Sequence, residues 1–256
     1  MGEWEQRALV ARERRGRVEA RRDREVLAWI ARFRFVTVEV LAERFSTSVR
    51  RADSRVSALA VVGLVECRKD SVGQRRAVFV SRRGAVELGL PPRRAPRPEV
   101  HRTHELAIAR LAARIERDRP DGRVFTEREG RRLEAGGEAR FSVDVIEPRG
   151  ARQRRWPDLV VEVGASRVAL EIEIAAKTTE RLARIVSAYA TAGVFTEVRF
   201  LAASAPLALR LAALCERAGG QVPVLAGRAT VLRVAPWPGA EASKLARIES
   251  VLARGS

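Results

Sequence analysis

The fold of the first half of the chain is decided by residues 37–80, which read TVEVLAERFSTSVRRADSRVSALAVVGLVECRKDSVGQRRAVFV. Thr37 is placed to cap a short helix, and the cluster Ser46-Thr47-Ser48 forms a turn that can cap the next one. This second helix is predicted over residues 49–62, because apolar side chains recur there at helical spacing until Gly63. The pattern indicates two helices joined by a tight polar turn.

A hairpin is predicted directly after these helices. Its strands are expected at residues 64–68 and 77–80, joined by a polar turn rich in basic residues. A further amphipathic helix is predicted upstream, at residues 22–33. Three helices followed by a hairpin is the order of a winged helix-turn-helix domain, which we expect over residues 20–89. Residues 90–100 are rich in proline and predict a stiff linker.

A winged helix-turn-helix predicts which residues meet DNA. The second helix of the motif enters the major groove, and its first residues meet base edges. The contacts expected at the start of this helix are Thr47, Ser48, Arg50, Arg51, Ser54 and Arg55. Those expected on the hairpin, facing phosphate or the minor groove, are Arg68, Lys69, Arg75 and Arg76. A domain used only for protein contacts is the alternative.

The second half, residues 101–236, predicts a mixed α/β domain. Helices are expected at residues 103–117, 178–192 and 207–218, and strands at 124–126, 141–146, 158–163, 168–174, 197–202 and 230–234. The turn Gly164-Ala165-Ser166 joins two of these strands into a hairpin. The fold class expected for the whole chain is therefore α/β, with a mixed sheet in its second domain.

This second hairpin carries a candidate catalytic and metal site. Alternation places Glu171 and Glu173 on one face of a strand, and Asp158 opens the neighbouring strand. Carboxylates converging at one place suit Mg²⁺ or Mn²⁺, and we expect Asp158 and Glu171 to be the ligands. Such a metal would activate water, and Lys177 would stabilise the charge that develops. The alternative is a salt-bridged sheet face, with Arg154, Arg155 or Arg167 as partners.

Other kinds of site find less support in the sequence. His101 and His104 lie three residues apart without further zinc ligands, so we expect them to be histidines of a linker or helix face. No glycine-rich phosphate loop appears, so the sequence does not support a nucleotide motor of that class. Aromatic residues make up 5% of the chain, too few for a platform that stacks single-stranded bases.

The second half resembles the PD-(D/E)XK nuclease superfamily, with Pro157-Asp158, a hairpin and then an acidic triplet. The third position of the triplet is Glu173 where that superfamily has lysine, and Lys177 is a displaced candidate. The whole chain resembles the replication-relaxation family of plasmid and mobile-element proteins over roughly residues 20–205. The motifs that carry this resemblance are Ser81-Arg82-Arg83-Gly84-Ala85, His101 to Glu105, Thr126-Glu127-Arg128-Glu129, Pro157-Asp158 and Glu171-Ile172-Glu173. It implies a role in replication, DNA relaxation, mobilisation or regulation of such an element.

The charge of the chain predicts a polyanionic partner. Lysine and arginine together number 49 against 32 acidic residues, giving a net charge of +17. Two distant cysteines support neither a disulfide framework nor a zinc ribbon. Neither a membrane span nor a signal peptide is apparent, so we expect a cytoplasmic protein that does not engage the membrane.

Two functions are consistent with these features. The first is a sequence-selective protein that binds double-stranded DNA and acts in replication, relaxation or transcriptional regulation of a plasmid or mobile element. The second is a metal-dependent endonuclease or nickase that uses Asp158, Glu171 and Lys177. The sequence leaves open whether the chain acts alone or as a homodimer.

Overall fold

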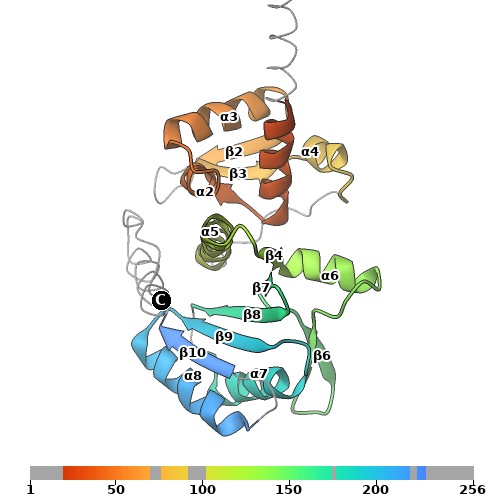
Figure 1. The fold of residues 1–256 in the computed structure, drawn as a ribbon, viewed down its shortest axis with the longest axis vertical. Coiled ribbons are helices and arrows are strands. Elements are labelled where there is room, and N and C mark those ends of the chain that lie inside the picture. Colours follow the sequence, from red (N-terminus) through yellow and green to blue (C-terminus); the bar gives the residue numbers. More distant parts are fainter. Residues whose placement is uncertain (1–19, 70–75, 92–101, 175–176, 220–223, 229–256) are drawn as a thin grey trace, which may run out of the picture. The chain divides into compact units, whose positions relative to one another are not determined.

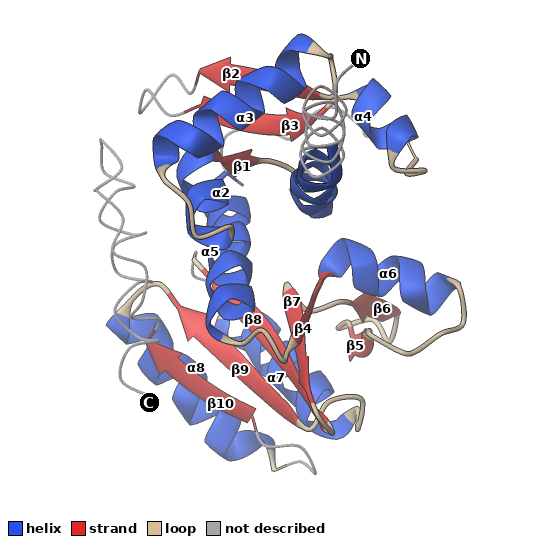
Figure 2. Cartoon of the chain, turned by 45° about the horizontal axis from the view of Figure 1, so that its top comes forward, coloured by secondary structure: helices blue, strands red, loops and turns tan. Residues whose placement is uncertain are grey.

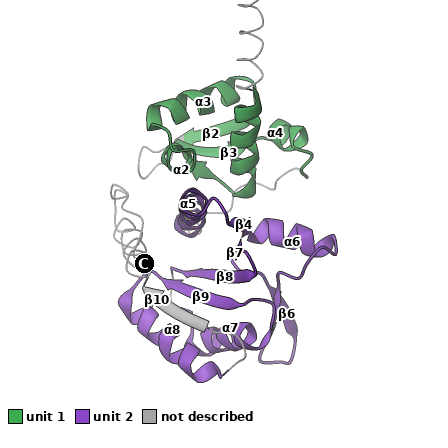
Figure 3. Ribbon diagram, viewed as in Figure 1, with its two compact units in different colours: residues 1–70, 75–96 green, residues 71–74, 97–256 purple. Residues whose placement is uncertain are grey.

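The computed structural model describes residues 20–69, 76–91, 102–174, 177–219 and 224–228. The chain divides into two compact units, coloured separately in Figure 3. Unit 1 comprises residues 1–70 and 75–96, and unit 2 comprises residues 71–74 and 97–256. The expected strand at residues 230–234, most of the proline-rich segment, Arg75 and His101 lie outside the described residues.

Unit 1 is a small bundle of helices packed on a three-stranded sheet (Figure 1). Its elements are a helix at residues 20–32, β1 (Val36–Thr37), α2 (Val38–Arg44), α3 (Val49–Val61), β2 (Val65–Lys69), β3 (Arg76–Val80) and α4 (Arg82–Glu87). The sheet is antiparallel in the order β1-β3-β2. The buried residues Leu27, Ile30, Leu41, Val56 and Val78 form the centre of the core. The helices and hairpin follow one another in the order that the sequence predicts.

Two local features fix the path of the chain after α3. Gly63 adopts a φ of 73°, a left-handed conformation that glycine takes readily, and it turns the chain out of the helix. Ser81 Oγ accepts a hydrogen bond from Gly84 N (2.9 Å) and donates one to Gly63 O (2.6 Å). A Cβ atom on Gly84 would lie 2.1 Å from Leu64 O, so only glycine allows α4 to pack this close.

Unit 2 mixes helices with a five-stranded sheet and a separate two-stranded ribbon (Figure 2). Its elements are α5 (Arg102–Asp118), β4 (Arg123–Thr126), α6 (Glu127–Ala135), β5 (Val143–Ile146), β6 (Arg152–Arg155), β7 (Leu159–Val163), β8 (Ser166–Glu173), α7 (Thr179–Thr191), β9 (Glu197–Ala202), α8 (Ala205–Ala218) and β10 (Val224–Arg228). The large sheet has the order β10-β9-β8-β7-β4. Strands β8, β9 and β10 run parallel, whereas β4 and β7 are antiparallel to their neighbours. The mixed sheet expected from the sequence is confirmed.

The two faces of the large sheet are covered by different helices. Helices α7 and α8 cover one face, over a core that includes Ala169, Phe200, Tyr189 and Leu211. Helix α5 contacts β4 and β8 and lies on the other face (Figure 2). Because side chains alternate along β8, Glu171 and Glu173 share the face of Ala169 and are buried on the side of α7.

Helix α6 and strand β6 are elements that the sequence analysis missed. Thr126 and Glu129 form a capping box at the start of α6, in which each residue accepts from the other's backbone N–H. This Thr-x-x-Glu pattern is visible in the sequence and was the available indication of the helix. Strand β6 reads Arg-Gln-Arg-Arg and pairs with β5. Its sequence is entirely polar, so it lacks the apolar alternation by which a strand is predicted.

Candidate functional site

The outward face of α3 carries basic and small side chains. Arg50, Arg51, Ser54 and Ala58 are exposed on the side opposite the buried residues of the helix. Ser54 Oγ donates to Arg50 O at 3.0 Å, which folds that side chain back onto the helix. Two guanidinium groups therefore flank a helix surface on which small residues permit close approach of a partner.

The turn before α3 positions these arginines. Ser46 has a φ of 47°, and Thr47 N donates to Ala42 O at 2.9 Å, so the chain reverses sharply after α2. Ser48 Oγ then caps α3 by accepting from Arg51 N at 3.3 Å. The Ser48 side chain is exposed and its hydroxyl proton is still available for donation to a phosphate oxygen.

Two of the expected DNA contacts are engaged inside unit 1. Arg55 donates to Asp23 of the first helix, and both side chains are partly shielded from solvent. Arg76 Nη1 donates to Asp53 Oδ1 (3.0 Å) and Ser57 Oγ (2.7 Å), which fastens the base of β3 to α3. These guanidinium groups connect secondary-structure elements of unit 1, and their contact with DNA stays a prediction.

On the β2–β3 hairpin, Arg68 is an exposed basic group that can reach a partner. The Arg68 side chain is 58% exposed and contacts Glu66 at 3.5 Å. Its guanidinium carbon lies 5.3 Å from the centroid of the Phe79 ring, a cation–π arrangement. The side chain of Lys69 and the whole of Arg75 fall outside the described residues.

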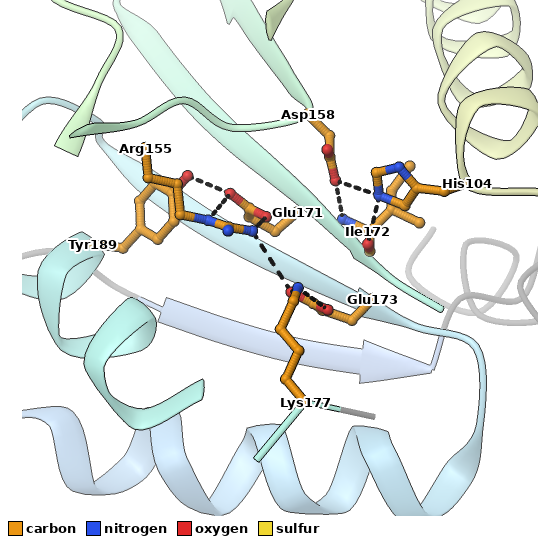
Figure 4. A network of polar contacts seen from close by, with 8 residues as sticks. All are labelled: His104, Arg155, Asp158, Glu171, Ile172, Glu173, Lys177 and Tyr189. Atoms are coloured by element: carbon orange, nitrogen blue, oxygen red, sulfur yellow. Dashed lines mark hydrogen bonds and ion pairs between the residues drawn. The ribbon is translucent and has the colours of Figure 1, made fainter. Parts of the chain in front are cut away.

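In unit 2, the Asp158 side chain hydrogen-bonds the backbone of β8 just beyond its last residue pair with β7 (Figure 4). The register that pairs Leu159 with Leu170 places Pro157 opposite Ile172, and proline has no N–H to donate. Asp158 Oδ2 accepts the hydrogen bond of Ile172 N at 2.7 Å. His104 Nε2 lies 3.0 Å from Ile172 O and 3.2 Å from Asp158 Oδ2. The Pro-Asp pair thus directly precedes β7, and Asp158 and His104 together satisfy the two backbone polar groups of Ile172.

The partners of His104 fix its protonation. Because a carbonyl oxygen only accepts, Nε2 must carry the hydrogen that points at Ile172 O. Burial alone would lower the pKa of His104, but the charge and hydrogen bond of Asp158 outweigh it and raise the pKa to about 9. His104 is therefore an imidazolium at neutral pH, and its charge in turn lowers the pKa of Asp158 against the effect of burial.

The stability of unit 2 should fall as pH rises through the titration of His104. The folded pKa of about 9 exceeds the unfolded value of about 6.5, so the contribution is full below pH 6.5 and is lost by about pH 9. We expect the free energy of unfolding to fall by about 2 kcal/mol over this pH range. This figure is reduced for solvent screening, because the His104 side chain is 32% exposed. Denaturant unfolding of wild type and His104→Gln at pH 6 and pH 9.5 measures the difference. Parallel pH profiles for the two proteins would contradict the assignment, and Asp158→Asn should mimic His104→Gln.

Glu171 lies in a second network, in which Glu171 and Tyr189 are buried and Arg155 is partly buried. Arg155 reaches it through two hydrogen bonds, from Nε to Oε1 (3.1 Å) and from Nη2 to Oε2 (2.5 Å). The hydroxyl of Tyr189 on α7 donates to Oε1 as well. Burial raises the pKa of Glu171, and the Arg155 guanidinium opposes that rise by stabilising the carboxylate. Burial and the adjacent carboxylate raise the pKa of Tyr189, so its hydroxyl remains a donor.

Glu173 pairs with Lys177. The Lys177 ammonium donates to both carboxylate oxygens, and Arg155 Nη2 lies 3.8 Å from Glu173 Oε1. The side chain of Glu173 is 2% exposed and that of Lys177 25%. Lys177 therefore stands at the edge of the cluster and shields Glu173 from solvent.

The three carboxylates predicted to converge on a metal thus each have a cation of the protein's own. Asp158 is paired with His104, Glu171 with Arg155, and Glu173 with Lys177. Among the residues that the structure describes, no group of three acidic, histidine or cysteine side chains is arranged to hold a metal ion. A divalent ion that bound Glu171 would compete with Arg155 for its carboxylate oxygens. The carboxylates are thus arranged as in the salt-bridged alternative, and binding of Mg²⁺ or Mn²⁺ by Asp158 and Glu171 stays a prediction.

Two members of this cluster escaped the sequence analysis. His104 was expected to be an ordinary helix-face histidine, and its only sequence signal was its place near the start of a helix that covers the sheet. Tyr189 is the single tyrosine of the chain and gave no signal, because its partner Glu171 lies on another element. Arg155 had been one of three candidate partners, and the structure selects it.

Comparison with known proteins adds no family to this description. No family model matches the chain. No curated protein and no solved structure matches it either. Within the described residues, no helix has the length and apolar character needed to cross a membrane. The function of the protein must therefore be inferred from its own residues.

Proposed function

We propose that the protein binds double-stranded DNA sequence-selectively, with unit 1 as a winged helix-turn-helix. In this proposal α3 is the recognition helix and the β2–β3 hairpin is the wing. The observation that carries it is the outward face of α3, where Arg50 and Arg51 follow the capped turn at Ser48. Arginine at the start of a recognition helix can bind guanine O6 and N7 through two parallel hydrogen bonds.

The remaining contacts in this proposal position the protein on the duplex. Ser48 and Thr47 lie where a phosphate would meet the start of α3, and Arg68 extends from the wing. The net charge of +17 supports a polyanionic partner of this kind. Lys69 and Arg75 remain proposed contacts on the strength of the sequence alone.

For unit 2 we propose a PD-(D/E)XK nuclease-like scaffold whose acidic cluster serves stability. The order of α5, the β7–β8 hairpin and α7 supports this, as does the position of Asp158, Glu171 and Lys177. The pairing of each carboxylate with a cation supports a structural role for the cluster. We place the protein, by the resemblance in its sequence, in the replication, relaxation or transcriptional regulation of a plasmid or mobile element, with a homodimer as one form it can take.

The test of DNA binding is a selection from random duplexes by the full-length protein, followed by affinity measurements. We expect enrichment of a defined sequence, with affinity at least 10³-fold above that for a scrambled duplex at physiological salt. A plot of log affinity against log salt concentration should be linear. Its negative slope should be proportional to the number of phosphate contacts. Recovery of no preferred sequence would contradict recognition by α3.

A metal-dependent endonuclease or nickase is the second candidate. It is favoured by one observation, the gathering of Glu171, Glu173 and Lys177 near Asp158 in the order of that superfamily. It requires that Mg²⁺ or Mn²⁺ displace Arg155 from Glu171 and bind between Asp158 and Glu171.

The two candidates differ in their response to Mn²⁺. Because every carboxylate of the cluster already has a cation, added Mn²⁺ should leave the melting temperature of wild type unchanged, and supercoiled plasmid should stay intact. The matched control is Asp158→Ala, which removes one proposed ligand. A stabilisation by Mn²⁺ that this variant abolishes, together with metal-dependent nicking, would instead establish the nuclease.

A further inference from the structure

A two-stranded antiparallel ribbon in unit 2 has a basic outer face. The ribbon comprises β5, β6 and the turn between them, residues 143–155. The turn closes through hydrogen bonds from Glu147 N to Ala151 O (2.8 Å) and from Gly150 N to Glu147 O (2.9 Å). Gly150 has a φ of 78°, which suits glycine in a tight hairpin turn.

The inner face of the ribbon is fixed to the body of unit 2. Val143 and Val145 are buried in the core beside α7, whose helix contacts β5. Glu134 of α6 accepts hydrogen bonds from Phe141 N (3.1 Å), Ser142 Oγ (2.6 Å) and Trp156 Nε1 (3.0 Å). Since these donors flank both strands, the ribbon is anchored at its base and presents its outer face rigidly.

The outer face is exposed and bears more cations than anions. The register places Arg152 opposite Ile146 and Arg154 opposite Asp144, while Arg149 lies in the turn. These three arginines are exposed, and Arg154 is 65% exposed at 3.7 Å from Glu134. The acidic residues nearby have partners, since Asp144 accepts from Arg140 (2.9 Å) and Glu147 from Arg184 (3.3 Å).

We propose that this ribbon is a second DNA-binding element, which lays Arg149, Arg152 and Arg154 along the phosphates of a duplex. The inference rests on the proposed binding of DNA by the chain. Side chains two residues apart on a strand are separated by about 6.7 Å, close to twice the axial rise of about 3.4 Å between successive phosphates of one DNA strand. A two-stranded ribbon also has the width that the major groove admits.

The salt dependence of binding tests this proposal in the full-length protein. The ribbon variant carries Arg149→Gln, Arg152→Gln and Arg154→Gln. Its matched control loses the same charge from exposed arginines elsewhere in unit 2, through Arg119→Gln, Arg181→Gln and Arg217→Gln. We expect the ribbon variant to bind the selected and scrambled duplexes more weakly by similar factors. The slope of log affinity against log salt should become shallower by about 2–3, or about 0.9 for each lost phosphate contact.

The outcomes separate this proposal from the proposed function. If wild type binds no duplex, DNA binding by the chain is itself refuted. If wild type binds but the ribbon variant matches its control in slope and affinity, the ribbon proposal is overturned and recognition by unit 1 stands. Lysine at the same three positions should restore the wild-type slope, because phosphate contact depends on charge. Failure of lysine to restore it in a variant with wild-type melting temperature would overturn the proposal too.

Discussion

Replacing Arg50 and Arg51 together with alanine should abolish the preference of the protein for its selected duplex. Both guanidinium groups are exposed at the start of α3, where side chains of a recognition helix reach base edges. An arginine that reads a guanine contributes about 1–3 kcal/mol, or roughly 5- to 150-fold in Kd. We therefore expect the affinity for the selected duplex to fall toward that for a scrambled one.

Two controls make this result specific. Arg82→Ala with Arg83→Ala removes the same charge from exposed positions of α4 in the same unit and should leave the preference intact. Arg55→Ala should lower the stability of unit 1 more than it alters the preference, because Arg55 is bonded to Asp23. An unchanged preference in the Arg50 and Arg51 variant would remove α3 from the DNA interface.

Arg155→Met should destabilise unit 2 more than any change at an exposed arginine. It would leave the carboxylate of Glu171, which is 1% exposed, without its cation. Removing one partner of a buried ion pair costs about 3–5 kcal/mol, because the other charge remains desolvated. For a unit of this size we expect the melting temperature to fall by roughly 6–20 °C.

Neighbouring and paired substitutions distinguish this mechanism from general damage. Arg154→Met changes the adjacent and exposed residue and should leave the melting temperature nearly unchanged. Adding Glu171→Leu to Arg155→Met removes the stranded charge and should recover part of the lost stability. If Arg155→Met and Arg154→Met have the same melting temperature, the pair of Arg155 and Glu171 does not have the stabilising role assigned to it.

Much of the fold could be predicted because its elements are periodic and well delimited. The apolar spacing and the Ser48 cap indicated α3, and Gly164 indicated the turn between β7 and β8. Strand β6 could not be found in this way, since Arg152, Gln153 and Arg154 are exposed and no apolar alternation marks the strand. A polar strand of this kind can be assigned only from its pairing with another strand in the structure.

The candidate site was predicted less well, for reasons that are physical. Alternation correctly placed Glu171 and Glu173 on one face, but the sequence does not show that α7 buries this face. Convergence of Asp158 with them was inferred from adjacency of strands. In the structure its Oδ2 instead accepts a hydrogen bond from Ile172 N, and His104 contacts Ile172 O, the group to which Pro157 has no N–H to donate. Pairings between distant elements, such as Tyr189 with Glu171, depend on tertiary packing.

The mixed pairing of β8 has a consequence for how unit 2 forms. Its antiparallel partner β7 is joined to it by a two-residue turn, whereas its parallel partner β9 follows only after α7. Local hairpins form within about 1–10 μs, and pairings that close longer loops come later. We therefore expect Glu171 to be still hydrated when the hairpin forms, and to lose water when α7 docks with Tyr189. Substitutions in this buried network should then accelerate unfolding and leave the refolding rate almost unchanged.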